Sequence, residues 1–155
     1  MAYPLSLSGL SEREEITDTV VRALLGLDSN DKFLWESAWA LDSDIILDIN
    51  GNVLKGLENI NKGCFDKVGP MNTQHLLSNI RIDLEEGANV ARLTAYVLAQ
   101  HYRPGEGVAP NSEHLLAGAT YDIQVVKESN GKWNLKAFAL KIIWRQGNPE
   151  VMESA

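Results

Sequence analysis

Residues 73–102 read TQHLLSNIRIDL, EEGAN and VARLTAYVLAQHY, two long strand-like segments joined by a short turn. Two more segments of this kind follow, at residues 114–127 and 133–144, after a loop at 103–111 and a turn at 129–131. Parallel neighbours need a crossover of about a dozen residues or more, so segments with such short connections pair antiparallel. The second half of the chain therefore predicts an antiparallel meander.

The first half of the chain has helical patterning. Ser11 and Glu14 form a capping-box pattern at the start of a helix. Apolar residues then recur at helical spacing, at Ile16, Val20, Leu24 and Leu27. Shorter elements follow: a helix at 33–40, a strand at 45–49, a type I′ turn at Asn50-Gly51 and a helix at 56–68.

Helices first and strands afterwards is the order of an α+β fold, in which N-terminal helices cover one face of a curved antiparallel sheet. Such a sheet forms a cone with an open mouth, where we expect a single apolar pocket for a ligand. We expect one domain over residues 1–155, with an arm at 1–10 and a tail at 146–155.

Composition excludes several classes of partner. The net charge of −7 disfavours nucleic acid and anionic membrane surfaces, because both attract basic proteins. The single cysteine, Cys64, excludes an internal disulfide, and the N-terminus has no signal-peptide pattern. No apolar run approaches the ~20 residues that span a bilayer. These features predict a cytoplasmic protein.

Three residues are candidates for catalysis. His75 reads as a strand residue facing an apolar pocket, where an imidazole works as a general base near neutral pH. Asp28, just after the first helix, is a carboxylate that can hold this ring in one tautomer. His101 ends a row of small apolar residues on the strand at 90–102, as a residue lining a pocket would.

Each of these candidates has a structural alternative. His75 can be a buried histidine bonded to a backbone carbonyl, and His101 can be a strand-end residue facing water. Asp28 can cap the second helix, although Asn30 or Asp31 can supply that cap instead.

Strand alternation suggests further residues for substrate binding. Asn79 shares a face with His75, and Thr120 shares one with Asp122, while Tyr96 belongs to the other row of its strand. Alternating polar residues usually face solvent, which is the alternative for Thr120 and Asp122. No H-x-H, H-E-x-x-H or C-x-x-C spacing and no glycine-rich phosphate loop is present, so we expect neither metal nor cofactor.

The order of elements resembles the nuclear-transport-factor-2-like superfamily, and within it the SnoaL-like branch that includes scytalone dehydratase and hexachlorocyclohexane dehydrochlorinase. The stretch Thr73-Gln74-His75 is similar to the surroundings of the dehydratase's catalytic histidine, and Asp28 matches the place of its orienting aspartate. The resemblance also puts His101 at a second histidine, and Thr120 and Asp122 at a pair of small polar cavity residues.

Two departures from the family pattern concern phenols. The dehydratase has two tyrosines that hold a water on the substrate carbonyl, whereas this chain has Leu27 and the stretch Asp48-Ile49 at those places. Tyr96 or Tyr121 would then have to supply a phenol. The basic residue that the dehydrochlorinase uses on a late strand has no equivalent here.

The resemblance implies a cofactor-independent lyase of the dehydratase type, acting on a small hydrophobic cyclic or aromatic hydroxy-ketone such as a secondary-metabolite intermediate. His75 would remove the proton next to the carbonyl, Asp28 would hold its other ring nitrogen, and His101 with Asp122 would bind the leaving hydroxyl. The alternatives are an isomerase or cyclase that uses the same dyad, and a non-catalytic binding module.

We also expect a homodimer or homotrimer, because the outer side of the curved sheet is rather apolar for open solvent. The residues that the alternation assigns to that side are Val90, Arg92, Tyr121, Ile123 and Val125.

Overall fold

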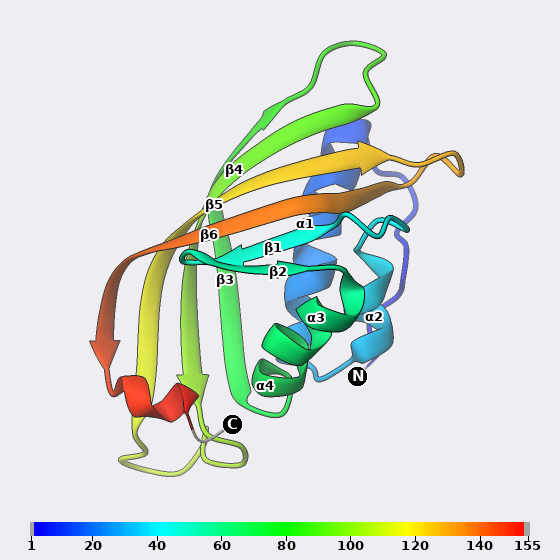
Figure 1. The fold of residues 1–155 in the computed structure, drawn as a ribbon. Coiled ribbons are helices and arrows are strands. Elements are labelled where there is room, and N and C mark those ends of the chain that lie inside the picture. Colours follow the sequence, from blue (N-terminus) through cyan, green and yellow to red (C-terminus); the bar gives the residue numbers. More distant parts are fainter. Residues whose placement is uncertain (1, 154–155) are drawn as a thin grey trace.

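Helices lie against one side of a six-stranded sheet in the computed structural model, which describes residues 2–153 (Figure 1). The helical elements are α1 (Glu12–Asp28), α2 (Lys32–Ser37), α3 (Leu57–Ile60), the π-helix η1 (Asn61–Phe65), α4 (Asp66–Val68) and the 3₁₀ helix η2 (Pro149–Met152). The strands are β1 (Ile46–Ile49), β2 (Asn52–Lys55), β3 (Asn72–Asp83), β4 (Val90–Tyr102), β5 (His114–Lys127) and β6 (Trp133–Gly147).

The strands follow the order β2-β1-β6-β5-β4-β3 across the sheet. The predicted meander is confirmed as β3 to β6, all paired antiparallel, and with it the α+β cone. The sheet as a whole is mixed, because the short strand β1, outside the meander, runs parallel to β6. The chain between β1 and β6 contains β2, the third helical segment and three long strands, which more than spans the crossover that a parallel pair needs.

The helices begin as predicted but end differently. The Ser11 hydroxyl accepts a hydrogen bond from the Glu14 backbone N–H at 3.2 Å, and the Glu14 carboxylate accepts one from the Ser11 N–H at 2.7 Å. α2 ends at Ser37, and Trp39 forms an isolated bridge with Leu135 instead of extending the helix. The third helix is interrupted by the π-helical turn η1, which buries Cys64.

The inner face of the sheet, defined as the side that packs on α1 and α2, carries the main core. On β5 this face bears Leu115, Ala117, Ala119, Tyr121, Ile123 and Val125, all of them buried. Tyr121, Ile123 and Val125 were expected on the outer face, and that expectation was wrong. A period of two shows which residues share a face but not which face is covered, and here the bulkier apolar row turns inward.

The two ends of the chain differ. Residues 2–10 form no helix or strand, whereas residues 146–153 are partly structured. β6 continues to Gly147, and Val151 of η2 is fully buried against Met71 and Leu115. Position 1 of the arm and positions 154–155 of the tail lie outside the described residues. Within 2–153, no helix has the length and apolar character needed to cross a membrane.

Candidate active site

Asp28 is the last residue of α1, and its carboxylate binds two residues near the start of β3. Its Oδ2 accepts the backbone N–H of His75 at 2.9 Å, and its Oδ1 accepts the hydroxyl of Thr73 at 2.8 Å. Oδ1 also lies 2.6 Å from Nδ1 of the His75 ring. An ionised carboxylate only accepts, so Nδ1 is the donor in this contact. Asp28 therefore fixes His75 by its backbone and by its ring.

The alternative role of Asp28, as the cap of the second helix, belongs to another residue. Asp31 precedes α2, and its Oδ1 accepts the Leu34 backbone N–H at 3.0 Å. Asp31 supplies the cap, and within residues 2–153 the hydrogen bonds of the Asp28 side chain go to Thr73 and His75 of β3.

His75 combines burial with one unoccupied ring nitrogen. Its side chain is 9% exposed and that of Asp28 is 15% exposed. A neutral imidazole that donates through Nδ1–H has its lone pair at Nε2. This Nε2 makes no hydrogen bond with any residue from 2 to 153. The arrangement can accept a proton from a bound molecule and stabilise the resulting imidazolium beside Asp28.

His101 lies next to this pair on β4. The ring centroids of His75 and His101 are 5.6 Å apart, and the ring planes are nearly perpendicular. Nδ1 of His101 lies 3.0 Å from the carbonyl oxygen of Leu115. Burial lowers the pKa of His101, although the bond to Leu115 opposes this shift. His101 is therefore a neutral group beside the dyad at neutral pH.

Sequence reasoning missed Thr73 as a member of the site. Its hydroxyl donates to Asp28, and it pairs across the ladder with His101. Thr73 and His75 are two residues apart, so both project from the same face of a strand. That spacing was the available signal, since a residue two positions from His75 on β3 shares its face of the sheet.

Three of the expected substrate-binding residues lie away from His75. Asn79 is exposed and falls in the β-bulge between Ser78 and Arg81, where its φ of 53° breaks the alternation that would align it with His75. Tyr96 is 56% exposed on the outer face, and Thr120 also lies on that face, half-buried. The structure corrects these expectations because neighbouring residues on β4 and β5 take the inner positions.

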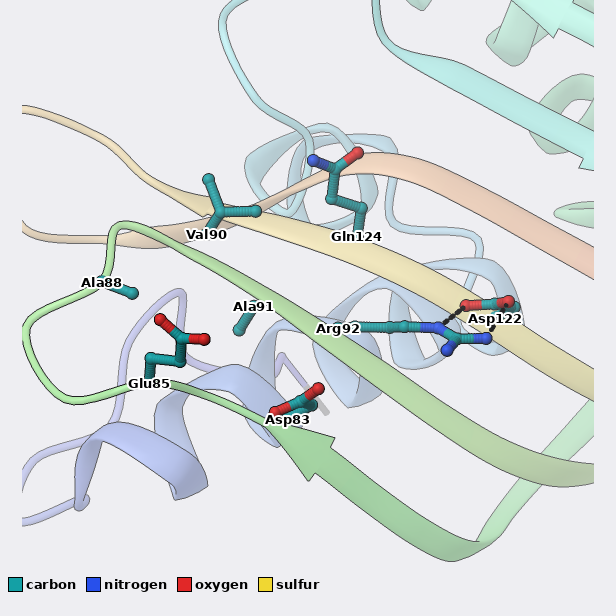
Figure 2. A pocket seen from close by; sticks show the side chains of 8 residues that line it. All are labelled: Asp83, Glu85, Ala88, Val90, Ala91, Arg92, Asp122 and Gln124. Carbon is teal, nitrogen blue, oxygen red and sulfur yellow. Dashed lines mark hydrogen bonds and ion pairs between the residues drawn. The ribbon is translucent and has the colours of Figure 1, made fainter.

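Asp122 lies on the outer face as well, where its two oxygens accept hydrogen bonds from Arg92 at 2.8 and 2.7 Å (Figure 2). It borders two surface hollows of about 570 and 470 Å³, lined largely by charged and polar side chains that include Asp83, Glu85 and Lys141. These hollows differ from the apolar pocket expected in the cone. On the inner face, the neighbours of Thr120 and Asp122 are Ala119 and Tyr121.

Other reactive groups play a smaller part. Within the described range 2–153, no three side chains of histidine, cysteine, aspartate or glutamate gather as a possible metal site. Cys64 is a free, buried cysteine, and burial raises the pKa of its thiol to about 12. It therefore stays protonated at neutral pH and is not a nucleophile.

Comparison with known proteins identifies the family. Residues 8–139 match the family described as SnoaL-like domain. The chain belongs to the SnoaL-like family. A curated relative, the terrestric acid biosynthesis cluster protein E of Penicillium crustosum, is 39% identical over 149 residues, which cover 95% of this chain and 94% of the relative.

Two solved structures show the same fold. A candidate scytalone dehydratase of Novosphingobium aromaticivorans superposes with a TM-score of 0.74 at 22% identity, covering 88% of this chain and 87% of that protein. A type 2 hexachlorocyclohexane dehydrochlorinase gives a TM-score of 0.72 at 20% identity, covering 88% of both chains. The resemblance to the SnoaL-like branch of the nuclear-transport-factor-2-like superfamily is thereby confirmed. The relatives of this SnoaL-like protein include proteins named as enzymes.

Proposed function

We propose that this SnoaL-like protein is a cofactor-independent lyase of the dehydratase type, which removes water from a small cyclic or aromatic hydroxy-ketone. The observation that carries the proposal is the 2.6 Å contact between Nδ1 of His75 and Oδ1 of Asp28, which directs the lone pair of a general base to Nε2. The relative from a biosynthesis cluster supports a secondary metabolite as the substrate. The likeness to a candidate scytalone dehydratase supports an elimination.

The reaction would begin with proton transfer to His75. Nε2 takes the proton from the carbon next to the carbonyl, and the C–H electron pair moves into an enolate. The enolate re-forms the carbonyl as the neighbouring C–O bond breaks, and the hydroxyl leaves as water with the proton that His75 returns. Asp28 stabilises the imidazolium in between, and acid–base catalysis of this kind contributes about 10²–10⁴-fold.

His101 would contact the leaving group. Its ring is neutral at neutral pH and stands at right angles to that of His75, 5.6 Å away. A neutral imidazole adds no charge that would compete with Asp28 for the imidazolium. It would hydrogen-bond the departing hydroxyl, the role that Asp122 cannot fill from the outer face.

A β-hydroxytetralone tests this proposal, because loss of water converts it to a naphthol with a new absorbance band. The wild-type protein should form the naphthol, and His75→Ala should fall to the rate of buffer alone. Circular dichroism of the variant should match the wild type, since alanine keeps the backbone N–H that donates to Asp28. A variant that turns over normally would contradict the role of His75.

An isomerase or cyclase is the second candidate, because it would start with the same transfer of a proton to Nε2. The products separate the candidates: an isomerase conserves the mass of its substrate, whereas a dehydratase lowers it by one water. A protein that binds tetralones but leaves both substrate types unchanged would be a binding module.

We further propose that the protein forms a homodimer or homotrimer through the outer face of its sheet and acts in the cytoplasm. Leu76, Leu98 and Gly118 pair in sequence across β3, β4 and β5, and Gly118 pairs with Trp144 of β6. Leu76, Leu98 and Trp144 are each about half exposed, which leaves an apolar strip on that face. The free thiol of Cys64 suits a reducing compartment.

A further inference from the structure

Tyr121 is a buried polar residue that the dyad does not use. It lies in the middle of β5 on the inner face, is 5% exposed, and packs edge-on against Phe138 with ring centroids 4.6 Å apart. Its hydroxyl makes no hydrogen bond with any of residues 2–153. A phenol hydroxyl that has no partner in the protein can donate a hydrogen bond to a bound molecule.

Tyr121 lies on the same face of the sheet as His75, because the β4 partners of the two residues, Ala95 and Ala99, are both inner residues. Burial raises the pKa of Tyr121, and the nearby Cys64 and Asp28 raise it further. Asp28 therefore acts both on His75, by a hydrogen bond, and on Tyr121, by its charge. The phenol stays protonated at neutral pH and is a hydrogen-bond donor.

Small side chains cover the inner face between His75 and Tyr121. Ala99 pairs with His75, and Ala95 pairs with Tyr121. The other inner residues of this stretch on β4 and β5 are Val97, Ala117 and Ala119. We call these five residues the alanine floor. Beyond Tyr121 the same face becomes bulky again, with Leu93 and Ile123.

The length of the alanine floor suits a small ring. Ala99 and Ala95 are four residues apart, which is about 13 Å along a strand at about 3.3 Å per residue. His75 on β3 and Tyr121 on β5 flank this stretch of β4, one near each end. A flat, six-membered or fused ring would lie on the alanines with one edge at each polar group.

We propose that Tyr121 is a further catalytic residue, which donates a hydrogen bond to the carbonyl oxygen of a cyclic ketone lying on the alanine floor. This inference rests on the proposed function, in which His75 removes the proton next to that carbonyl. The C–H electron pair shifts toward the carbonyl oxygen, and the phenol stabilises the developing charge while its own O–H bond stays intact. A donor aimed at such an oxygen typically accounts for about 10²–10³-fold in kcat.

A pair of probes isolates the hydrogen bond of Tyr121. Tetralone and tetralin share one ring skeleton, and only tetralone carries a carbonyl oxygen. The wild-type protein should bind tetralone more tightly than tetralin, as measured by NMR titration. Tyr121→Phe should lose about tenfold of tetralone affinity and keep its affinity for tetralin, because removing one hydrogen bond of about 1.4 kcal/mol changes an equilibrium tenfold.

Matched variants make the result decisive. Tyr96→Phe makes the same chemical change on the outer face and should keep the preference for tetralone. His75→Ala should keep it too, so the binding result stands even where catalysis fails. Equal affinity of the wild type for both probes, or an unchanged preference in Tyr121→Phe, would overturn the inference.

Stability separates a catalytic phenol from a structural one. Because the Tyr121 hydroxyl has no partner in the protein, Tyr121→Phe should unfold at the same or a higher denaturant concentration than the wild type. The naphthol-forming rate should nevertheless fall about 100-fold. A lower unfolding midpoint, with both probes bound more weakly, would show that Tyr121 only packs the core.

Discussion

Asp28 has two tasks at the scale of single residues, and they use different parts of its carboxylate. Oδ2 holds the backbone of β3, while Oδ1 receives the ring of His75 and the hydroxyl of Thr73. The sequence could predict the pairing with His75 because the residue types and their order resemble those of the family. It could not predict the hydrogen bond from the His75 backbone N–H to Asp28, since every residue except proline carries such a donor.

Asp28→Asn should lower kcat by about 10²–10⁴-fold and change KM far less, because an amide can no longer stabilise the imidazolium of His75. Steady-state kinetics with the β-hydroxytetralone measure both constants. Asp31→Asn is the matched control, because asparagine caps a helix as well as aspartate does. Normal turnover by Asp28→Asn would contradict the dyad.

His101 should make stability depend on pH. Its pKa is lowered from 6.5 in the folded protein, so the unfolded chain binds a proton there more readily. The free energy of unfolding should be highest above this value and should fall as the pH drops below it, until the folded protein also binds the proton. Denaturant titrations across this range should show a shallower fall for His101→Asn. Equal slopes for both proteins would show that His101 is not held neutral by the fold.

At the scale of elements, the contact between α1 and α2 sets the position of Asp28. Gly26 of α1 lies against α2, where a Cβ atom would come within 2.6 Å of the Trp35 backbone nitrogen. Backbone cannot move aside as a side chain can. The small residue at this point lets α1 end close to β3 and bring Asp28 to His75.

Gly26→Ala should therefore destabilise the protein by about 1–3 kcal/mol, although the same change inside an exposed helix stabilises it. Activity should fall with it, since the end of α1 must shift. Gly63→Ala is a useful comparison, because the three atoms nearest to its Cβ belong to the side chain of Leu54, which can rotate. Thermal unfolding measures both; an increase in stability for Gly26→Ala would contradict the close packing.

Local sequence patterns predicted most of the helices and strands. The features that they missed depend on contacts between distant parts of the chain. The capping box and the Asn50-Gly51 turn depend only on residues close together in the sequence, and both are confirmed. The parallel pairing of β1 with β6 depends on how the chain returns, which no short pattern encodes. The face of β5 was assigned wrongly because alternation shows which residues share a face but not which face the helices cover.

At the scale of the whole molecule, the outer face should hold copies of the protein together. Leu98→Lys places a charge in the middle of the apolar strip and should convert the oligomer to a monomer without loss of folding stability. Light scattering coupled to size-exclusion chromatography measures the mass. Gln124→Lys, an exposed substitution on the same face outside the strip, should leave the oligomer intact. A wild-type monomer would contradict self-association.

The fold alone does not determine the chemistry, because cones of this kind carry different functions. In this molecule the inner face of the sheet brings together His75, held by Asp28, and Tyr121, with small residues between them. The first two residues were predictable from sequence. The face on which Tyr121 lies became clear only from the structure.

Deuterium exchange next to a ketone tests the central claim most directly, because it requires only the first proton transfer and no knowledge of the natural substrate. Tetralone is incubated with the protein in D₂O, and NMR follows the loss of the signal from the protons beside the carbonyl. The wild type should accelerate this exchange by at least about 100-fold over buffer, and His75→Ala should not accelerate it. Exchange by His75→Ala at the wild-type rate, or no acceleration by the wild type, would contradict His75 as the base held by Asp28.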